Sequence, residues 1–579
     1  MLYSEDMLFR RFGKRRIREI APEDIFLDSS NLPNLSSSQF EGRVEQPVAP
    51  AAIVAVGLCF VLVVSGFAYR AFSLQVMQGE TYAEISRDNT LDRSLIFATR
   101  GVIYDRRGKE LAWNEAQSAS TTVGKIASSS DMYAYRVYSP LPGLSHVVGY
   151  VQYPKADTAG NWWREEYVGI SGVELSFDEM LAGRNGNAIV ETNALGRVER
   201  ENIVLPPERG EDLTLAIDAD LQSKLYEVLS SHSSRQGFKG GAAVIMDVRT
   251  GELLALTSFP EYDHLAFVQG NSEAVRAASN DARTPLLNRA VSGLYTPGSI
   301  VKPMFAAAAL QEGIISPEKQ INSTGALILP NPYNPDAPSI FRDWTVHGWV
   351  DMRTAIAVSS DEYFYVLGGG FGGQKGLGIS KIDEYSRRFG LASTTGIDLR
   401  GDTGGIIPTP EWKARVFGED DPWRIGNTYH TSIGQYGFQI TPLHAVRFTA
   451  AIANGGKLLK PQLLASTTAE FTEIGIKDEY LQIAREGMRM AVTSDRHDAT
   501  VKSLYIAGIQ IAGKTGTAQI GARNEWMNSW SVGFWPADNP KYAFAVVLEK
   551  APAGTLSGAS PGLVPFFQWL VAERPEYVK

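Results

Sequence analysis

The distribution of apolar and polar positions divides the chain into successive segments. Residues 1–47 are mostly polar, and residues 48–69 form an apolar run without a charged side chain. Residues 70–235 combine short alternating stretches with glycine turns and are predicted to form a β-rich domain. A polar stretch at 231–241 indicates a boundary, and one larger domain is predicted at 236–579.

The larger domain is predicted to begin and end with β-strands. Compact apolar strands are expected at 242–247, 253–257, 505–519, 529–535 and 542–549. Between these two groups, apolar residues at helical spacing predict helices at 300–310, 443–453 and 480–492. Strands from both ends of a domain with helices between them favour an α+β fold, in which one antiparallel sheet is flanked by helices.

The uncharged run at 48–69 is long enough to cross a bilayer, whose apolar core is about 30 Å thick. A cleaved signal peptide is one alternative, but its apolar stretch spans about 7–15 residues and lies nearer the N-terminus. A buried helix of a globular domain is the other alternative, although this run is apolar on every face. We therefore expect a single uncleaved transmembrane anchor.

The orientation of the anchor is less directly indicated. Basic residues at 10–18 favour a cytoplasmic N-terminus, but the positive-inside effect operates within roughly 15–20 residues of a span, and this cluster lies farther away. Closer to the run, Arg43 on one side is balanced by Arg70 and Arg87 on the other. We expect residues 1–47 to be a cytoplasmic tail, because the chemistry argued below takes place outside the cytoplasm.

The composition excludes several kinds of partner and site. The formal net charge of −9 argues against a nucleic-acid partner, which normally requires a basic surface. The single cysteine, Cys59, lies in the apolar run, so no intramolecular disulfide or thiolate metal site is expected. The seven histidines show no His-x-x-x-His spacing. We expect neither a metal site nor a cofactor.

The first candidate site is the sequence Thr-Pro-Gly-Ser-Ile-Val-Lys-Pro at 296–303. Pro-Gly breaks the chain, and Ser299 is predicted to open a helix in which Lys302 lies on the same face. A serine at a helix start lies among unpaired backbone N–H groups, which can stabilise an oxyanion. The Ser-x-x-Lys pattern alone is weak, because Ser316 and Lys319 repeat it. There we expect a helix cap and a solvated lysine.

Two further motifs strengthen the first. Ser-Ser-Asp at 359–361 follows an apolar helical stretch at 352–358, and Lys-Thr-Gly-Thr at 514–517 lies on the strand predicted at 505–519. Together the three motifs resemble the set Ser-x-x-Lys, Ser-Asp-Asn and Lys-Thr-Gly that penicillin-binding proteins and class A β-lactamases share. We expect these distant segments to converge on one pocket.

The first two motifs supply the groups for acyl transfer. Ser299 Oγ attacks a carbonyl and becomes acylated, which divides one difficult step into two easier ones. Lys302 can accept the proton of Ser299 if burial lowers the pKa of the amine sufficiently. Ser359 can relay a proton to or from the leaving amine, and Asp361 can hold either a substrate amide or a lysine.

The third motif is predicted to bind the substrate. Lys514 and Thr515 offer a cation and a hydroxyl to a terminal carboxylate. Gly516 has no side chain and lets an extended peptide lie against the strand edge, next to Thr517. The backbone N–H groups of Ser299 and Thr517 are the predicted donors of an oxyanion hole.

With these motifs, the chain resembles a class B penicillin-binding protein, most closely the elongation subgroup that works with RodA-type SEDS glycosyltransferases. Asp361 supports this subgroup over the division subgroup, because most relatives carry Asn there. Further segments similar to family motifs lie at 100–108, 172–174, 196, 212–222, 288–290 and 434–437. Two segments depart from the pattern. Gly-Gln-Tyr-Gly at 434–437 replaces the usual Gly-Gln-Gly, and His347-Gly348 replaces a different Gly-His context, so we expect no metal role there.

The resemblance implies a non-catalytic pedestal domain at 70–235 and a transpeptidase domain at 236–579. The donor substrate implied is a peptidoglycan stem peptide ending in D-Ala-D-Ala, and β-lactams are expected to acylate Ser299 as substrate mimics. The implied partners are a RodA-type glycosyltransferase and proteins of the elongation complex. The implied location is the bacterial cytoplasmic membrane, with a single span and the catalytic domain outside the cytoplasm.

Other interpretations were weighed against this one. A class A β-lactamase positions a deacylating water with a glutamate at a fixed spacing before an asparagine, and neither Asn427 nor Asn454 is preceded in that way. A D,D-carboxypeptidase shares the acyl-serine chemistry. A non-enzymatic penicillin sensor or a structural scaffold belongs to another class, but a sensor is expected to carry several spans and a cytoplasmic effector. A bifunctional class A enzyme needs a glycosyltransferase domain, and no acidic motif at 70–235 resembles one.

Overall fold

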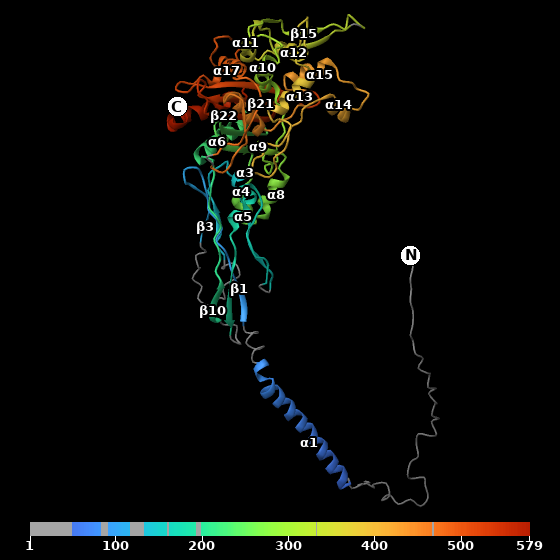
Figure 1. The fold of residues 1–579 in the computed structure, drawn as a ribbon, viewed down its shortest axis with the longest axis vertical. Coiled ribbons are helices and arrows are strands. Elements are labelled where there is room, and N and C mark those ends of the chain that lie inside the picture. The colour runs from blue at the N-terminus through green and yellow to red at the C-terminus, as the bar shows by residue number, and fades with distance from the viewer. Residues whose placement is uncertain are drawn as a thin grey trace, which may run out of the picture. The chain divides into compact units, whose positions relative to one another are not determined.

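The structure, a computed structural model, describes residues 49–82, 91–115, 133–158, 161–192, 198–331, 333–465 and 468–579. The described chain divides into two units between Leu91 and Asp92, and Figure 1 shows helix α1 in the first unit and the sheets in the second. The predicted polar tail at 1–47 lies outside the described residues.

The first unit contains the apolar helix α1, Pro50–Phe72, which continues into a short π-helical segment, Ser73–Met77. Pro50 lies in the first turn, where its missing N–H breaks no helical hydrogen bond. No residue of α1 is buried, which argues against a helix of a protein core. Among the described residues, it belongs to the one helix that is long and apolar enough to cross a membrane. The predicted apolar helix is confirmed, shifted by a few residues towards the C-terminus.

The first part of the second unit is rich in short strands, as predicted. A four-stranded sheet has the order β11-β2-β3-β4, with bounds Leu213–Thr214, Ile103–Tyr104, Glu110–Glu115 and Tyr135–Tyr138. A three-stranded sheet has the order β1-β9-β10, with bounds Leu91–Ile96, Gly186–Thr192 and Val198–Leu205. Two small hairpin sheets, β5-β8 and β6-β7, have bounds Val151–Gln152, Val168–Gly169, Lys155–Ala156 and Trp162–Arg164. The short helices α3, α4 and α5 have bounds Ser145–Val148, Gly172–Ser176 and Asp178–Ala182.

The central sheet of the second unit has five strands in the order β13-β12-β22-β21-β20. Their bounds, in the same order, are Leu253–Phe259, Gly240–Asp247, Tyr542–Pro552, Trp526–Trp535 and Ala512–Ile520. All neighbouring pairs are antiparallel, and β12 from the start of the domain pairs with β22 from its end. The predicted antiparallel sheet built from both ends of the domain is confirmed.

Helices cover both faces of this sheet, so its central strands are apolar at successive positions. Along β12, Val244 and Met246 join the core cluster that contains α16, Pro442–Ala453. Ala243 and Ile245 point to the other face, where α6 and α18 pack. The bounds of these two helices are Ala219–Gln236 and Ala559–Glu573. This alternation follows from the two-residue period of a strand.

Further helices follow β13 and precede β20 along the chain. Those from α7 to α12 have bounds His264–Val268, Ser272–Asn280, Arg289–Ser292, Lys302–Gln311, Met352–Val358 and Asp361–Gly369. Those from α13 to α15, and α17, have bounds Gly378–Arg388, Pro410–Phe417, Ile425–Ser432 and Asp478–Thr493. Helix α17 packs against α10, α11 and strand β20, and thereby connects the helices to the sheet edge.

Small hairpins and 3-10 turns complete the unit. The two-stranded pairs β14-β17, β15-β16 and β18-β19 have bounds Ile321–Ser323, Gly348–Val350, Ala326–Leu329, Ser339–Arg342, Lys457–Leu459 and Phe471–Glu473. The 3-10 turns η6, η7 and η8 have bounds Gly298–Val301, Lys502–Leu504 and Pro575–Tyr577.

One local prediction needs correction. The strand expected at 505–519 begins only at Ala512, because the chain before it turns at Gly508, whose φ of 89° is left-handed. Within the polar stretch at 231–241, α6 continues to Gln236 and ends at the left-handed Gly237. The exact domain boundary near residue 235 stays a prediction.

Candidate active site

The predicted nucleophile lies in a tight turn before its helix. Ser299 is in the 3-10 turn Gly298–Val301, and the α-helix α10 starts at Lys302 rather than at Ser299 as expected. Pro303 is in the first turn of α10, where its missing N–H costs least. Gly298 has a φ of 57°, and its N–H donates to Gly434 O at 3.0 Å. The turn is therefore held by the Gly-Gln-Tyr-Gly segment as well as by its own helix.

Glycines allow this turn to lie directly against strand β20. A Cβ at position 516 would be 2.7 Å from Pro297 O, and a Cβ at position 298 would be 2.8 Å from Thr517 O. Neither approach is possible for a larger residue without moving backbone. Ser299 is half-buried beside this contact, and Trp530 Nε1 anchors the preceding loop by donating to Thr296 O at 2.9 Å.

The second motif forms the junction of two helices. Ser359 ends α11 in a left-handed conformation with φ 60° and ψ 38°. Ser360 then caps α12, and its Oγ accepts the N–H of Tyr363 at 3.2 Å. A non-glycine residue in this conformation costs about 1–3 kcal/mol and persists only where its surroundings hold it. Such strain is common at active sites.

Two buried lysines converge on Ser359. Lys302 Nζ donates to Asp361 Oδ1 at 2.6 Å and to Ser359 O at 2.7 Å, and it lies 3.3 Å from Ser359 Oγ. Lys514 Nζ donates to Ser359 Oγ at 2.8 Å and to Thr515 O at 2.7 Å. Both lysines are fully buried. Of the two tasks predicted for Asp361, holding a lysine is the one that the geometry supports.

The electrostatics of this cluster lower the pKa of a lysine and raise the pKa of a carboxyl. Burial lowers the pKa of Lys514 well below its usual value, the nearby Lys302 cation lowers it further, and Asp361 only partly opposes them. Burial also raises the pKa of Asp361, in spite of the Lys302 cation beside it. A lysine with a lowered pKa next to a hydroxyl can accept and return protons near neutral pH.

Four of the predicted site residues form one hydrogen-bonded cluster, and Ser299 lies next to it. Lys302, Ser359, Asp361 and Lys514 are joined by the hydrogen bonds given above. Ser299 is placed beside them by packing, since the turn η6 lies against β20, and within the described residues its hydroxyl makes no hydrogen bond to another side chain. On β20, which is an edge strand of the sheet, the side chain of Thr515 is half-buried and Thr517 is exposed.

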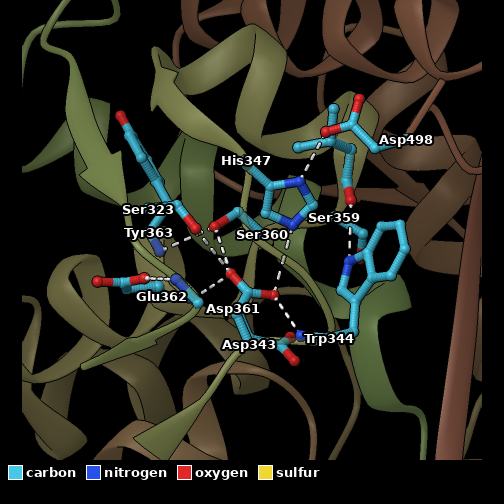
Figure 2. Close-up of polar contacts among 12 residues, drawn as sticks. Ser323, Asp343, Trp344, His347, Ser359, Ser360, Asp361, Glu362, Tyr363 and Asp498 are labelled. Atoms are coloured by element: carbon cyan, nitrogen blue, oxygen red, sulfur yellow. Dashed lines mark hydrogen bonds and ion pairs between the residues drawn. The ribbon is translucent and has the colours of Figure 1, made fainter. Parts of the chain in front are cut away.

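A set of acidic and imidazole groups behind this cluster was not predicted from the sequence. Asp343 lies behind Ser360, and it neighbours the buried His347, which contacts Asp498 (Figure 2). No spacing rule signals this set, because Asp498 follows the other two by a long stretch of chain. In the described part of the chain, no three His, Cys, Asp or Glu side chains are arranged to hold a metal ion.

Comparison with known proteins identifies the family. The model of the penicillin binding protein transpeptidase domain matches residues 241–564, and that of the penicillin-binding protein dimerisation domain matches residues 129–215. The peptidoglycan D,D-transpeptidase MrdA of Haemophilus influenzae is 29% identical over 85% of this chain and 87% of its own length.

Solved structures agree with this assignment. The penicillin-binding protein PBP2 of Helicobacter pylori, solved in complex with MreC, is 26% identical with a TM-score of 0.68, over 84% of this chain and 99% of that one. PBP2 of Pseudomonas aeruginosa is 29% identical with a TM-score of 0.66, over 84% of this chain and 100% of that one. The transpeptidase model alone covers more than half of the sequence. The chain therefore belongs to the penicillin-binding protein transpeptidase family.

Proposed function

We propose that this chain is a serine-type peptidoglycan D,D-transpeptidase of cell-wall elongation, with Ser299 as its nucleophile. One observation carries the assignment of the site: a single hydroxyl, Ser359 Oγ, lies within hydrogen-bond distance of two buried lysines, directly beside the Ser299 turn. That arrangement supports the proposal, because it places a candidate proton acceptor and a candidate proton relay, both buried, next to the turn that carries Ser299.

The first half-reaction forms an acyl-enzyme. Ser299 Oγ attacks the carbonyl of the penultimate D-Ala, and its proton passes to the lysine–Ser359 cluster. The backbone N–H groups of Ser299 and Thr517 stabilise the negative charge that develops on the carbonyl oxygen. The peptide bond to the terminal D-Ala then breaks, and Ser359 delivers the proton to the leaving amine. D-Ala departs, and the remaining stem peptide stays esterified to Ser299.

The second half-reaction transfers the acyl group to a neighbouring stem. Its amine attacks the ester carbonyl, the amine proton returns through the same groups to Ser299 Oγ, and a cross-link replaces the ester. Lys514 and Thr515 bind the terminal carboxylate of the donor. Gly516 and Thr517 receive the extended peptide along the free edge of β20, in the manner of an added strand. A β-lactam acylates Ser299 in the same way, but its leaving group stays attached.

The experiment that tests the nucleophile is covalent labelling. The purified full chain in detergent is treated with a fluorescent penicillin, and the labelled peptide is identified by mass spectrometry. We expect the adduct on Ser299 and its complete loss in Ser299→Ala, with Ser316→Ala as the matched control that keeps the label. An adduct on another residue, or an undiminished label in Ser299→Ala, contradicts the assignment.

We further propose a single-pass protein of the bacterial cytoplasmic membrane, with domains at 1–47, 48–69, 70–235 and 236–579. The apolar helix α1 supports the anchor, and the extracellular substrate requires the catalytic domain outside the cytoplasm. Because the Helicobacter pylori neighbour was solved with MreC, we infer that elongation-complex proteins and a RodA-type glycosyltransferase are partners. Protease added to intact spheroplasts is expected to remove everything beyond the anchor, whereas full protection contradicts this topology.

A further inference from the structure

A buried carboxylate–imidazole–carboxylate series lies behind the Ser359 turn. His347 Nδ1 is 2.8 Å from Asp498 Oδ2, and His347 Nε2 is 3.5 Å from Asp343 Oδ1 (Figure 2). The side chains of His347 and Asp343 are 0% exposed, and that of Asp498 is 1% exposed. Asp343 and His347 lie between β16 and β17, whereas Asp498 lies after α17. The series therefore ties two remote segments together.

Asp343 organises the first turn of α12, immediately after Ser359. Its Oδ2 accepts Ser360 Oγ at 2.7 Å and the N–H of Glu362 at 2.9 Å. The hydroxyl of Ser323 donates to the same oxygen at 3.2 Å. Ser360 is the cap of α12, so this carboxylate fixes the residue that follows the strained Ser359.

Trp344 fixes the residue that precedes Ser359. Its backbone N–H donates to Asp343 Oδ1 at 2.8 Å, and its Nε1 donates to Val358 O at 3.2 Å. The indole ring packs edge-on against His347, with ring centroids 5.1 Å apart. Both neighbours of Ser359 are thus hydrogen-bonded to the pair Asp343–Trp344, and His347 contacts both members of that pair.

Charge holds this arrangement together. Burial alone would lower the pKa of His347, but the carboxylates of Asp343 and Asp498 outweigh it and raise the pKa above its usual value. Burial alone would raise the pKa of Asp498, but Arg496 and His347 outweigh it and hold the pKa of that carboxyl at about 2. Arg496 Nη2 also donates to His347 O at 3.0 Å. His347 therefore stays protonated to a higher pH than an ordinary histidine, and it lies between two carboxylates.

We propose that His347 is a positioning residue of the transpeptidase reaction, which holds Asp343 and, through it, the Ser359 turn in the geometry that proton transfer requires. This inference rests on the proposed function. In the described part of the chain, no hydrogen bond or ion pair joins His347 to Ser299 or to strand β20. Its loss should therefore slow the covalent step and leave the preceding binding of a penicillin unchanged.

The charge on His347 also predicts a pH dependence. The imidazolium is present below its raised pKa and is lost as the pH rises through that value, and its attraction to Asp343 is lost with it. The charged groups facing His347 are Asp343, Asp498 and Arg496. Lys302 and Asp361 lie beyond Asp343 and are present in every variant compared below. If one limb of the pH profile depends on the charge of His347, that limb should be absent from a variant whose residue 347 cannot be protonated.

The test measures the acylation rate constant and the non-covalent dissociation constant separately, by following fluorescent-penicillin labelling of the full chain over a range of concentrations and pH. In His347→Gln we expect the acylation rate constant to fall about tenfold or more, because small misplacements are costly. The dissociation constant should stay within about twofold, and the alkaline limb should disappear. His497→Gln is the matched control, since that neighbouring histidine is exposed, and wild-type behaviour is expected.

Asp498→Asn is the second variant, because it keeps the size of the side chain and leaves His347 in place. It should slow acylation less than His347→Gln, and the double variant should be no slower than His347→Gln alone. If His347→Gln does not fold, the acylation rate constant of Asp498→Asn tests the inference instead. A wild-type acylation rate constant and pH profile in the active fraction of these variants overturns the inference. Absence of label on Ser299 in the wild-type chain instead overturns the proposed function.

Discussion

At the scale of single residues, the site depends on one carboxylate that compensates two buried amines. Lys302 and Lys514 are both fully buried and both reach Ser359, so each raises the cost of charging the other. Asp361 is the anion in direct contact with Lys302. Removing one partner of such a buried pair is costly, because it leaves an uncompensated charge in a medium of low polarity.

Asp361→Ala should therefore destabilise the protein by roughly 3–5 kcal/mol, the usual cost of breaking a buried ion pair. Asp361→Asn should cost less, because its amide oxygen can still accept a hydrogen bond from Lys302 Nζ. Thermal unfolding of the two variants measures the difference, with a lower Tm for the alanine variant. An unchanged Tm in Asp361→Ala would mean that Lys302 does not need this partner.

At the scale of secondary structure, the nucleophile turn and strand β20 are in backbone contact. Gly516 is the strand residue that makes this contact, because a side chain at position 516 would collide with Pro297 O. The edge position of β20 leaves its other side free for an extended peptide. The strand thus packs against the turn, and in the proposed function its edge also receives the substrate.

Gly516→Ala should push the Ser299 turn away from β20 and slow acylation by fluorescent penicillin about 100-fold, the scale of a 1 Å misplacement. Gly513→Ala on the same strand is the matched control. A Cβ there meets Val501 Cγ1 at 3.2 Å and Val532 O at 3.3 Å, so only small adjustments are needed. Equal acylation rates in the two variants would show that the close approach at Gly516 is not required.

The elements that could be predicted from the sequence are those with continuous local signals. Strands such as β12 and β22 are buried on both faces over most of their length and therefore contain continuous apolar runs, which can be recognised in the sequence. The three motifs also placed Ser359, Asp361 and both lysines together correctly. The start of β20 was predicted too early, because Gly508 and the 3-10 turn before it also lie among apolar residues. The role of Asp343 could not be predicted, because it depends on contacts with residues far away in the chain.

At the scale of the whole molecule, the unit Asp92–Lys579 joins the strand-rich segment to the catalytic sheet. Arg107 of the first part bonds Asp218 at 2.7 Å and Glu576 at 2.6 Å, next to the C-terminus. Within the strand-rich part, Glu174 is fully buried between Arg100 and Arg136, at 2.6 and 2.7 Å. Burial alone would raise the pKa of Glu174, but the two guanidinium groups outweigh it and lower the pKa.

Glu174→Gln should lower the Tm at neutral pH by an amount equivalent to roughly 3–5 kcal/mol, because Arg136 loses its carboxylate partner and Arg100 keeps only Asp178. The pKa of Glu174 is lowered in the folded state, so its contribution is present above about pH 4 and is lost as the pH falls below that value. The difference in Tm between wild type and variant should therefore shrink in acid. The acylation rate constant of the folded protein should not change. A difference in Tm that does not vary with pH would contradict this account.

The convergence of remote segments at Ser299 has a practical consequence for cell biology. Because the turn is closed by Gly434 on one side and by Gly516 on the other, a partly synthesised or misassembled chain should lack the reactive serine of the proposed function. A fluorescent antibiotic should thus report how many molecules have reached their native state, whereas an antibody against a linear epitope reports how many have been made. The ratio of the two signals, read on this protein after its separation from other penicillin-binding proteins, gives its folding yield.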